Sequence, residues 1–176
     1  QFDFSTPPVV GVINEALKTV ALTVPYGTDV TSLVPTITHT GVSISPDSSL
    51  PQDFTSPVVY TVTGADSVTQ NYTVTVTVAL NPAKAITAFS FASPAAMGSI
   101  DEGLHTISVV VPFGTDISAL VPTIAHTGAS IAPDPSIAQD FNTIVYYTVT
   151  AADSTTQAYS VTVTKAPAPI VSAPTS

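Results

Sequence analysis

The sequence predicts an all-β protein made of two tandem antiparallel β-sandwich domains. Three observations lead to this prediction. Short runs alternate large apolar residues with threonine or serine, which is the pattern of a half-buried strand. Glycine, proline and aspartate separate these runs, as expected at turns. The chain also aligns with itself at an offset of 87 residues, so the whole pattern occurs twice.

The 87-residue internal repeat sets the expected domain boundaries. Phe2 and Phe4 fall on Phe89 and Phe91 at this offset. Longer motifs coincide as well: Pro25–Asp29 with Pro112–Asp116, Leu33–Ile37 with Leu120–Ile124, and Gln52–Phe54 with Gln139–Phe141. A repeat of this length is too long for one solenoid unit and suits a self-contained sandwich of about 100 residues. We expect domains at residues 1–80 and 86–165, a linker at 81–85 and a proline-rich tail at 166–176.

The elements of the first copy follow one another at short intervals. Phe2–Phe4 predicts the first strand, and Leu17–Val24 alternates again. Pro25 ends the latter because proline has no N–H for the strand ladder. Gly27 supplies conformational freedom and Asp29 a capping side chain for the next turn. Two short strands are expected at 36–38 and 42–44, then a turn at 46–49.

The closing element of each copy has the clearest pattern. Val58–Val78 contains two alternating runs around a turn at Gly64–Ser67, which predicts a β-hairpin. Val145–Thr164 repeats it in the second copy. No run of helical length has a 3.6-residue period, although Leu33 after Thr31-Ser32 suggests one short helical turn. The order of strands favours Greek-key-like connections.

These motifs carry a family resemblance. The hairpin V-x-Y-T-V-T-x-x-D-x-x-T-Q-x-Y-T-V-T-V, with the P-x-G-T-D and L-V-P-T-I motifs before it, resembles the cadherin-like or immunoglobulin-like (Ig-like) β-sandwich repeats of bacterial cell-surface proteins. The resemblance covers both copies. It implies an extracellular repeat module that is arrayed as a stalk or spacer. It brings no catalytic residues with it.

Charge and composition exclude several classes of partner. The chain has 12 acidic and 3 basic residues, a net charge of −9. Nucleic-acid binding depends on lysine and arginine, so nucleic acid is a poor partner, and so is an anionic membrane surface. No apolar run approaches the roughly 20 residues of a spanning helix, so we expect no membrane insertion. The absence of cysteine excludes disulfides and thiolate metal sites.

The repeated polar residues predict no reactive site. Each acid recurs singly in its own turn, where side-chain capping explains it: Glu15, Asp29, Asp47, Asp53, Asp66 and their counterparts. A weak calcium site is the alternative, although calcium takes six to eight converging oxygens. His39 and His126, one in each copy, cannot form a zinc site by themselves. We therefore expect no enzyme, no catalytic residue, no metal ligand and no cofactor.

Aromatic residues supply the alternative function. Tyr26, its counterpart Phe113, and Tyr146 are candidate platforms for a glycan. Two further tyrosine pairs lie on apolar strand faces and are predicted core residues: Tyr60 with Tyr147, and Tyr72 with Tyr159. The chain has no tryptophan, which disfavours a carbohydrate groove. A ligand- or glycan-binding adhesin module is thus the alternative to the main prediction.

The main prediction is a secreted structural protein at a microbial cell surface, either a stalk or spacer or a filament subunit. The first copy lacks an equivalent of the stretch Ile86-Thr87-Ala88, whereas the tail after Lys165 has no domain to complete. In a complete subunit, the tail would add as a strand to the first domain of the next copy, head to tail. The residues expected at that subunit interface are Phe2, Phe4, Ile170 and Val171. In a fragment of a longer array, the partners would be neighbouring repeats.

Overall fold

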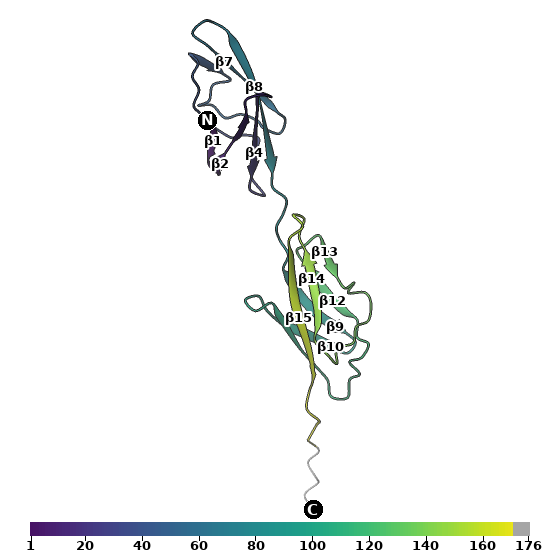
Figure 1. Ribbon diagram of the computed structural model, residues 1–176. Helices are drawn as coiled ribbons and strands as arrows, with labels where there is room; N and C mark the ends of the chain where they lie inside the picture. Colours follow the sequence, from purple (N-terminus) through teal and green to yellow (C-terminus); the bar gives the residue numbers. More distant parts are fainter. Residues whose placement is uncertain (171–176) are drawn as a thin grey trace, which may run out of the picture. The chain divides into compact units, whose positions relative to one another are not determined.

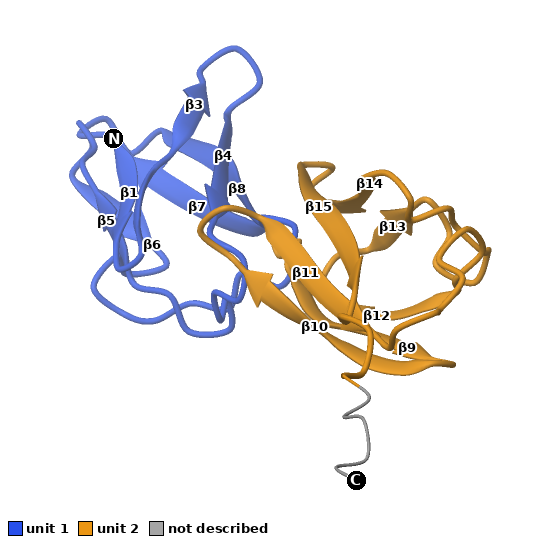
Figure 2. Ribbon diagram, turned by 90° about the horizontal axis from the view of Figure 1, so that it is seen from below, with its two compact units in different colours: residues 1–81 blue, residues 82–176 orange. Residues whose placement is uncertain are grey.

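The computed structural model describes residues 1–170 as strands and connecting segments, with no helix in that range (Figure 1). The chain divides into two compact units, Gln1–Asn81 (unit 1) and Pro82–Ser176 (unit 2), which Figure 2 colours separately. The predicted all-β class with two similar repeats is therefore confirmed. In the part of the chain that the structure describes, no helix is long and apolar enough to cross a membrane.

Unit 1 consists of two sheets. The three-stranded sheet has the order β2-β1-β5, with β1 at Phe2–Ser5, β2 at Pro8–Val10 and β5 at Pro35–Ile37. The five-stranded sheet has the order β3-β4-β8-β7-β6, with β3 at Val12–Asn14, β4 at Thr19–Val24, β6 at Ser43–Ser45, β7 at Val58–Thr63 and β8 at Thr69–Val78. Neighbouring strands are antiparallel except β4 and β8, which are parallel from Thr19 opposite Thr73 to Val24 opposite Val78.

Unit 2 has the same arrangement, except that a single strand, β10, stands in place of two strands of unit 1. Its order is β12-β9-β10-β11-β15-β14-β13. The bounds are β9 Ile86–Ala92, β10 Ala95–Asp101, β11 Thr106–Val111, β12 Pro122–His126, β13 Ser130–Ala132, β14 Val145–Thr150 and β15 Thr156–Lys165. The parallel pair of this unit is β11 with β15. The path of β10 corresponds to β2 and β3 of unit 1 taken together.

Strand β10 belongs to both layers because it changes partner midway. Ala95–Met97 pair with β9, whereas Gly98–Asp101 pair with β11. A Cβ atom on Gly98 would lie 2.9 Å from Cγ2 of Ile107 and 3.2 Å from Cβ of Phe89. Only a glycine therefore lets the strand cross so close to the core. Gly11 has the same role between β2 and β3, where a Cβ would lie 2.6 Å from the Phe2 carbonyl oxygen.

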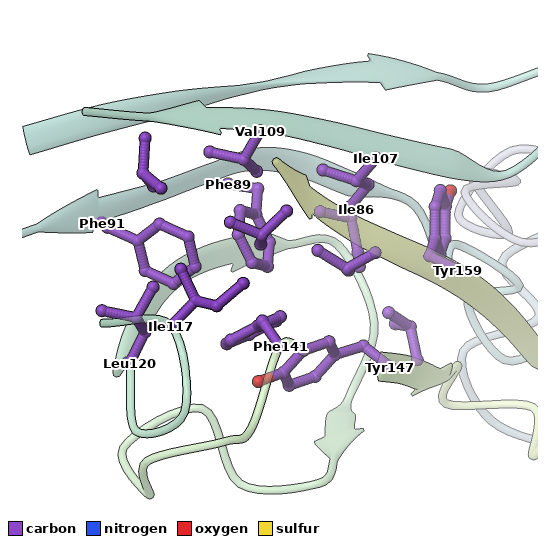
Figure 3. Close-up of a cluster of buried hydrophobic side chains, with 14 residues drawn as sticks. Ile86, Phe89, Phe91, Ile107, Val109, Ile117, Leu120, Phe141, Tyr147 and Tyr159 are labelled. Atoms are coloured by element: carbon purple, nitrogen blue, oxygen red, sulfur yellow. The ribbon is translucent and has the colours of Figure 1, made fainter. Parts of the chain in front are cut away.

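The core of each unit lies between its two layers of strands. In unit 2 it is built around Phe89, Phe91 and Phe141, whose rings meet edge to face with centroids 5.2 to 6.5 Å apart (Figure 3). Phe2, Phe4 and Phe54 repeat this arrangement in unit 1. Every second residue of the long strands faces these rings, which is why the alternation in the sequence located the strands.

The expected hairpin is present in both units. In unit 1 it comprises β7 and β8, with Gly64–Ser67 in the turn, as the alternation predicted. The helical turn suggested at Leu33 is wrong. Leu33 instead forms an isolated antiparallel bridge to Gln52, with N–H donors and carbonyl acceptors 2.9 and 3.0 Å apart. Two hydrogen bonds to a distant segment outweigh a weak local preference for one turn of helix.

Candidate functional sites

The repeated aspartates cap their own turns. In each case Oδ1 accepts the backbone N–H two residues further along, at 2.8 to 3.1 Å: Asp29, Asp47, Asp53, Asp66, Asp116, Asp134, Asp140 and Asp153. Hydrogen bonds to the ionised form stabilise it, and they lower the pKa of Asp29, Asp47 and Asp134 among others. No three His, Asp or Glu side chains gather as a metal site within residues 1–170.

An exposed aromatic ring stands at the same turn in both units. In unit 1 the turn is Pro25–Thr28, closed by the Thr28 N–H and hydroxyl, which donate to the Pro25 carbonyl at 3.2 and 2.8 Å. Gly27 has φ +79°, a conformation that favours glycine. Tyr26 lies between these anchors and is 58% exposed. The hydrogen bonds between Thr28 and Pro25 thus fix the turn on either side of Tyr26, whose ring faces solvent.

Unit 2 builds the same turn with phenylalanine. Thr115 donates from its N–H and hydroxyl to the Pro112 carbonyl at 3.2 and 2.8 Å, and Gly114 has φ +80°. Phe113 is 60% exposed. A large apolar ring held in solvent by a hydrogen-bonded turn adds nothing to the core. It is a candidate contact for a ligand with a flat apolar face.

Three of the four tyrosines predicted to be core residues are buried, and Tyr72 is not. Tyr146 on β14 is 61% exposed, but its counterpart in unit 1 is Val59, so this feature is not repeated. Tyr60, Tyr147 and Tyr159 are buried, which confirms the prediction that they are core residues. Tyr72 differs from its counterpart Tyr159 because it is only half-buried.

Tyr72 lines a cleft of about 520 Å³ in unit 1. Its hydroxyl donates to Glu15 at 3.0 Å, and the Lys18 ammonium donates to the same carboxylate at 2.8 Å while lying over the Tyr72 ring. Both hydrogen bonds lower the pKa of Glu15, and the one from Lys18 has the larger effect. Apolar side chains from both layers, Phe2 of β1 and Val62 of β7 among them, complete the floor of the cleft.

The same place in unit 2 is filled by Ile86. This side chain is 0% exposed, and Figure 3 shows it beside Ile107 and Tyr159. Tyr159 and Val149, the counterparts of Tyr72 and Val62, are fully buried there. At the 87-residue offset Gln1 corresponds to Ala88, so the counterpart of Ile86 would precede Gln1. The cleft of unit 1 lies where Ile86 packs in unit 2.

The four residues predicted for a subunit interface lie in different environments. Phe2 and Phe4 are buried in the unit 1 core, so neither ring is exposed to a partner. Ile170 is 95% exposed. Val171 lies outside the described residues. The structure brings Phe2 to the wall of the unit 1 cleft, and their shared role in an interface stays a prediction.

Sequence reasoning missed the cleft itself. Its lining includes His39, which was considered only as a zinc ligand, Gln70, which was noted only as part of the hairpin motif, and Tyr72, which the strand pattern assigned to the core. The signal that could have located it was present in the repeat. Ile86 is fully buried in the second copy, and its counterpart in the first copy would precede Gln1.

Comparison with known families gives a match in both units. The model of the family described as "SGBP, N-terminal" matches residues 1–76 and again residues 86–163. The chain belongs to the SGBP N-terminal family. SGBP denotes a glycan-binding protein. Membership agrees with the expected all-β module of a bacterial surface protein, whereas the cadherin-like part of the resemblance is not confirmed.

Solved structures show limited similarity to this SGBP N-terminal chain. A protein from Bacteroides thetaiotaomicron, to which glycoside hydrolase activity is attributed, is 28% identical with a TM-score of 0.39, over 57% of this chain and 31% of that one. A protein from Bacteroides fragilis described as secreted is 16% identical with a TM-score of 0.35, over 49% of this chain and 95% of that one. At such TM-scores neither similarity carries an argument about activity. No curated protein matches the chain.

Proposed function

We propose that this chain is a glycan-binding module of an extracellular, cell-surface protein, and that Tyr26 and Phe113 are its saccharide contacts. One observation carries the proposal. Two units of an SGBP N-terminal chain hold an exposed aromatic ring on the same hydrogen-bonded turn. The stalk and filament functions expected from the sequence have less support, because the family is named for binding glycans.

The chemistry of the turn suits a sugar ring. A pyranose presents a face of C–H groups, and an aromatic ring stacks on it while the sugar hydroxyls stay hydrated. Stacking is favoured where the backbone that carries the ring is fixed, and the Thr28 and Thr115 hydrogen bonds fix it by closing each turn. Preorganisation of this kind lowers the entropic cost of binding. A single ring makes a weak contact with one sugar. We therefore expect measurable affinity for polysaccharides, because their many sugar units can contact the rings of both turns or rebind after release.

The test is affinity electrophoresis of the purified chain in gels that contain one soluble polysaccharide each: an α-glucan, a β-glucan, a xylan or a mannan. We expect at least one to retard the wild-type chain. The double variant Tyr26→Ala/Phe113→Ala should lose that retardation, and each single variant should keep part of it.

Tyr146→Ala is the matched control, because Tyr146 is as exposed as the two turn residues but stands on a strand of unit 2 only. It should migrate like the wild type in every gel. Full retardation of the double variant, or no retardation of the wild type by any of the four polysaccharides, would contradict the proposal.

A further inference from the structure

We propose that the two aromatic turns select uncharged glycans, and that Asp29 and Asp116, each three residues after the exposed ring, are the residues that exclude sugars carrying a carboxylate or a sulfate. This inference rests on the proposed function, because it concerns the glycan that Tyr26 and Phe113 contact. It gives the two aspartates a role in specificity in addition to capping their own turns.

The carboxylate that follows Tyr26 is fixed in place and ionised. The Thr31 hydroxyl and backbone N–H donate to Oδ1 of Asp29 at 2.7 and 2.9 Å. Both hydrogen bonds lower the pKa of Asp29, the one from the hydroxyl more, so the group is charged at neutral pH. The Cα atoms of residues three apart lie at most about 11 Å from each other, which is close to the Debye length of about 10 Å at 0.1 M salt. An acidic sugar at the ring is therefore repelled.

A second carboxylate adds to the negative charge at this end of unit 1. The Phe54 N–H donates to the Val30 carbonyl at 2.8 Å, so the two segments lie side by side. Asp53 and Asp29 are the residues that precede this pair. The hydrogen bond from the Thr55 N–H has the largest effect on the pKa of Asp53 and lowers it, whereas the nearby charge of Asp29 acts in the opposite direction. The turn thus presents two like charges to a ligand.

No basic side chain of unit 1 offsets these charges. The chain has three basic residues, Lys18, Lys84 and Lys165, and the last two belong to unit 2. Lys18 pairs with Glu15 at 2.8 Å. It precedes β4, whose six residues place it about 20 Å from the turn that follows this strand. Within residues 1–81, no lysine or arginine stands at the turn of Tyr26 to attract an acidic sugar.

The turn of unit 2 differs by one positive charge. The Ser118 N–H and hydroxyl donate to Oδ1 of Asp116 at 3.0 and 2.7 Å. They lower the pKa of Asp116, the backbone N–H most, and the charge of Lys165 acts in the same direction. Val78 stands at the position of Lys165 in unit 1. The Lys165 ammonium offsets part of the negative charge near Phe113, so we expect unit 1 to exclude acidic sugars more strongly than unit 2.

An uncharged sugar complements the same carboxylates. Both donors of each cap bind Oδ1, so capping leaves Oδ2 of Asp29 and Asp116 to other donors. An ionised carboxylate only accepts hydrogen bonds, and bonds to a charged acceptor are stronger than those between neutral groups. Sugar hydroxyls are donors, whereas a carboxylate or sulfate in their place is an acceptor. Hydrogen bonding and charge therefore favour the same class of glycan.

Biolayer interferometry on immobilised polysaccharides tests the inference. The probes are a neutral polysaccharide that the wild-type chain binds and its hydroxyethyl and carboxymethyl ethers, which are similar in size and differ in charge. At about 10 mM salt, where the Debye length is about 30 Å, the wild type should bind the carboxymethyl ether about ten-fold more weakly than the hydroxyethyl ether. At about 1 M salt, where it is about 3 Å, the difference should nearly disappear.

Charge-removing variants assign the effect to the two aspartates. Asp29→Asn/Asp116→Asn keeps an oxygen for each cap and should narrow the difference at low salt to about three-fold. Asp66→Asn/Asp153→Asn is the matched control, because it removes the same charge from capped turns at the opposite end of each unit. The ten-residue strands β8 and β15 separate these turns from the aromatic ones by about 30 Å. The control should keep the ten-fold difference.

Three results would overturn the inference. These are equal binding of both ethers by the wild type at low salt, an unchanged difference in Asp29→Asn/Asp116→Asn, and an equal narrowing in the control. Binding of the neutral polysaccharide would persist in all three cases, so the proposed function would stand. That function fails on its own terms if the wild type binds no polysaccharide, or binds equally well after Tyr26→Ala/Phe113→Ala, and the inference then fails with it.

Discussion

Tyr60 and Tyr147 bury their hydroxyl groups without a hydrogen-bond partner among the described residues. Burial disfavours the phenolate, and it raises the pKa of both side chains to about 12. In the unfolded chain a tyrosine titrates near 10. The folded state therefore holds two protons that the unfolded state loses at high pH.

The consequence is a loss of stability in alkali. The contribution of these two groups is complete below about pH 10 and falls as the pH rises toward 12, because the unfolded chain releases protons first. Urea unfolding at pH 8 and pH 11 should show a lower midpoint at pH 11. Tyr60→Phe/Tyr147→Phe should reduce this difference, and an unchanged difference would show that other groups cause it.

The two buried tyrosines of unit 2 should respond differently to loss of their hydroxyls. Tyr159 donates to Glu102 at 2.7 Å, whereas the hydroxyl of Tyr147 meets no partner in the described chain. Tyr159→Phe should lower the free energy of unfolding by about 1 kcal/mol, the usual net value of one hydrogen bond. Tyr147→Phe should leave it unchanged or raise it, since it removes a polar group from an apolar site. Chemical denaturation of both variants makes the comparison, and equal losses would contradict it.

The capped turns predict sensitivity to acid. Hydrogen bonds to the carboxylate lower the pKa of Asp47 and Asp134 in the folded chain, so the stability that these groups supply is present above about pH 4 and is lost as the pH falls through the folded value. The urea midpoint should therefore fall between pH 5 and pH 2. Asp47→Ala/Asp134→Ala should lower the midpoint at pH 7 and reduce its decline in acid. A decline identical to that of the wild type would contradict this origin.

At the scale of elements, β10 shows how one strand serves two layers. The crossing depends on Gly98, which passes within contact distance of Ile107 and Phe89. Gly98→Ala should lower the free energy of unfolding by about 1–3 kcal/mol, the range for overpacking a core. Gly103→Ala is the control, because a Cβ there would meet only an Asp101 carboxylate oxygen at 3.4 Å. It should change stability by no more than about 0.5 kcal/mol. Similar losses for both would show that the crossing is not tightly packed.

The hairpin β7–β8 was predictable from sequence because its apolar residues alternate with threonine, and Tyr60 and Val74 of that alternation are buried. The split of β2 and β3 was not, since Val12–Asn14 are exposed and leave no alternating pattern. Alternation along a strand does not say whether its neighbour runs parallel or antiparallel, so the parallel pair β4–β8 could not be predicted from it.

Of the candidate sites, the turn at Tyr26 was found because it occurs in both copies. The cleft could not be predicted from alternation, because the residue that fills this place in unit 2 is Ile86 and its counterpart would precede Gln1.

At the scale of the molecule, each unit has its own apolar core. The cluster of unit 2 contains fourteen buried residues and that of unit 1 nine, and the difference includes Ile86 and Val149. Less buried apolar surface gives a less stable domain. Calorimetry should therefore show two unfolding transitions, with unit 1 in the lower one.

Matched substitutions assign the two transitions. Phe4→Ala should destabilise unit 1 by about 3–5 kcal/mol and shift the lower transition alone, and Phe91→Ala should do the same to the upper one. A single transition that both variants shift equally would show that the units unfold together.

The position of the terminal strands decides how each unit responds to tension. In unit 2 the chain enters through β9, which lies between β12 and β10, and leaves through β15, which lies between β11 and β14. Neither is an edge strand. A pull along β15 loads its six residue pairs with β11 and its six with β14 in shear, so these bonds share the force instead of opening one after another. A cell-surface module that is anchored at one end and bound to a polymer elsewhere would therefore stay folded up to a higher pulling force under liquid flow.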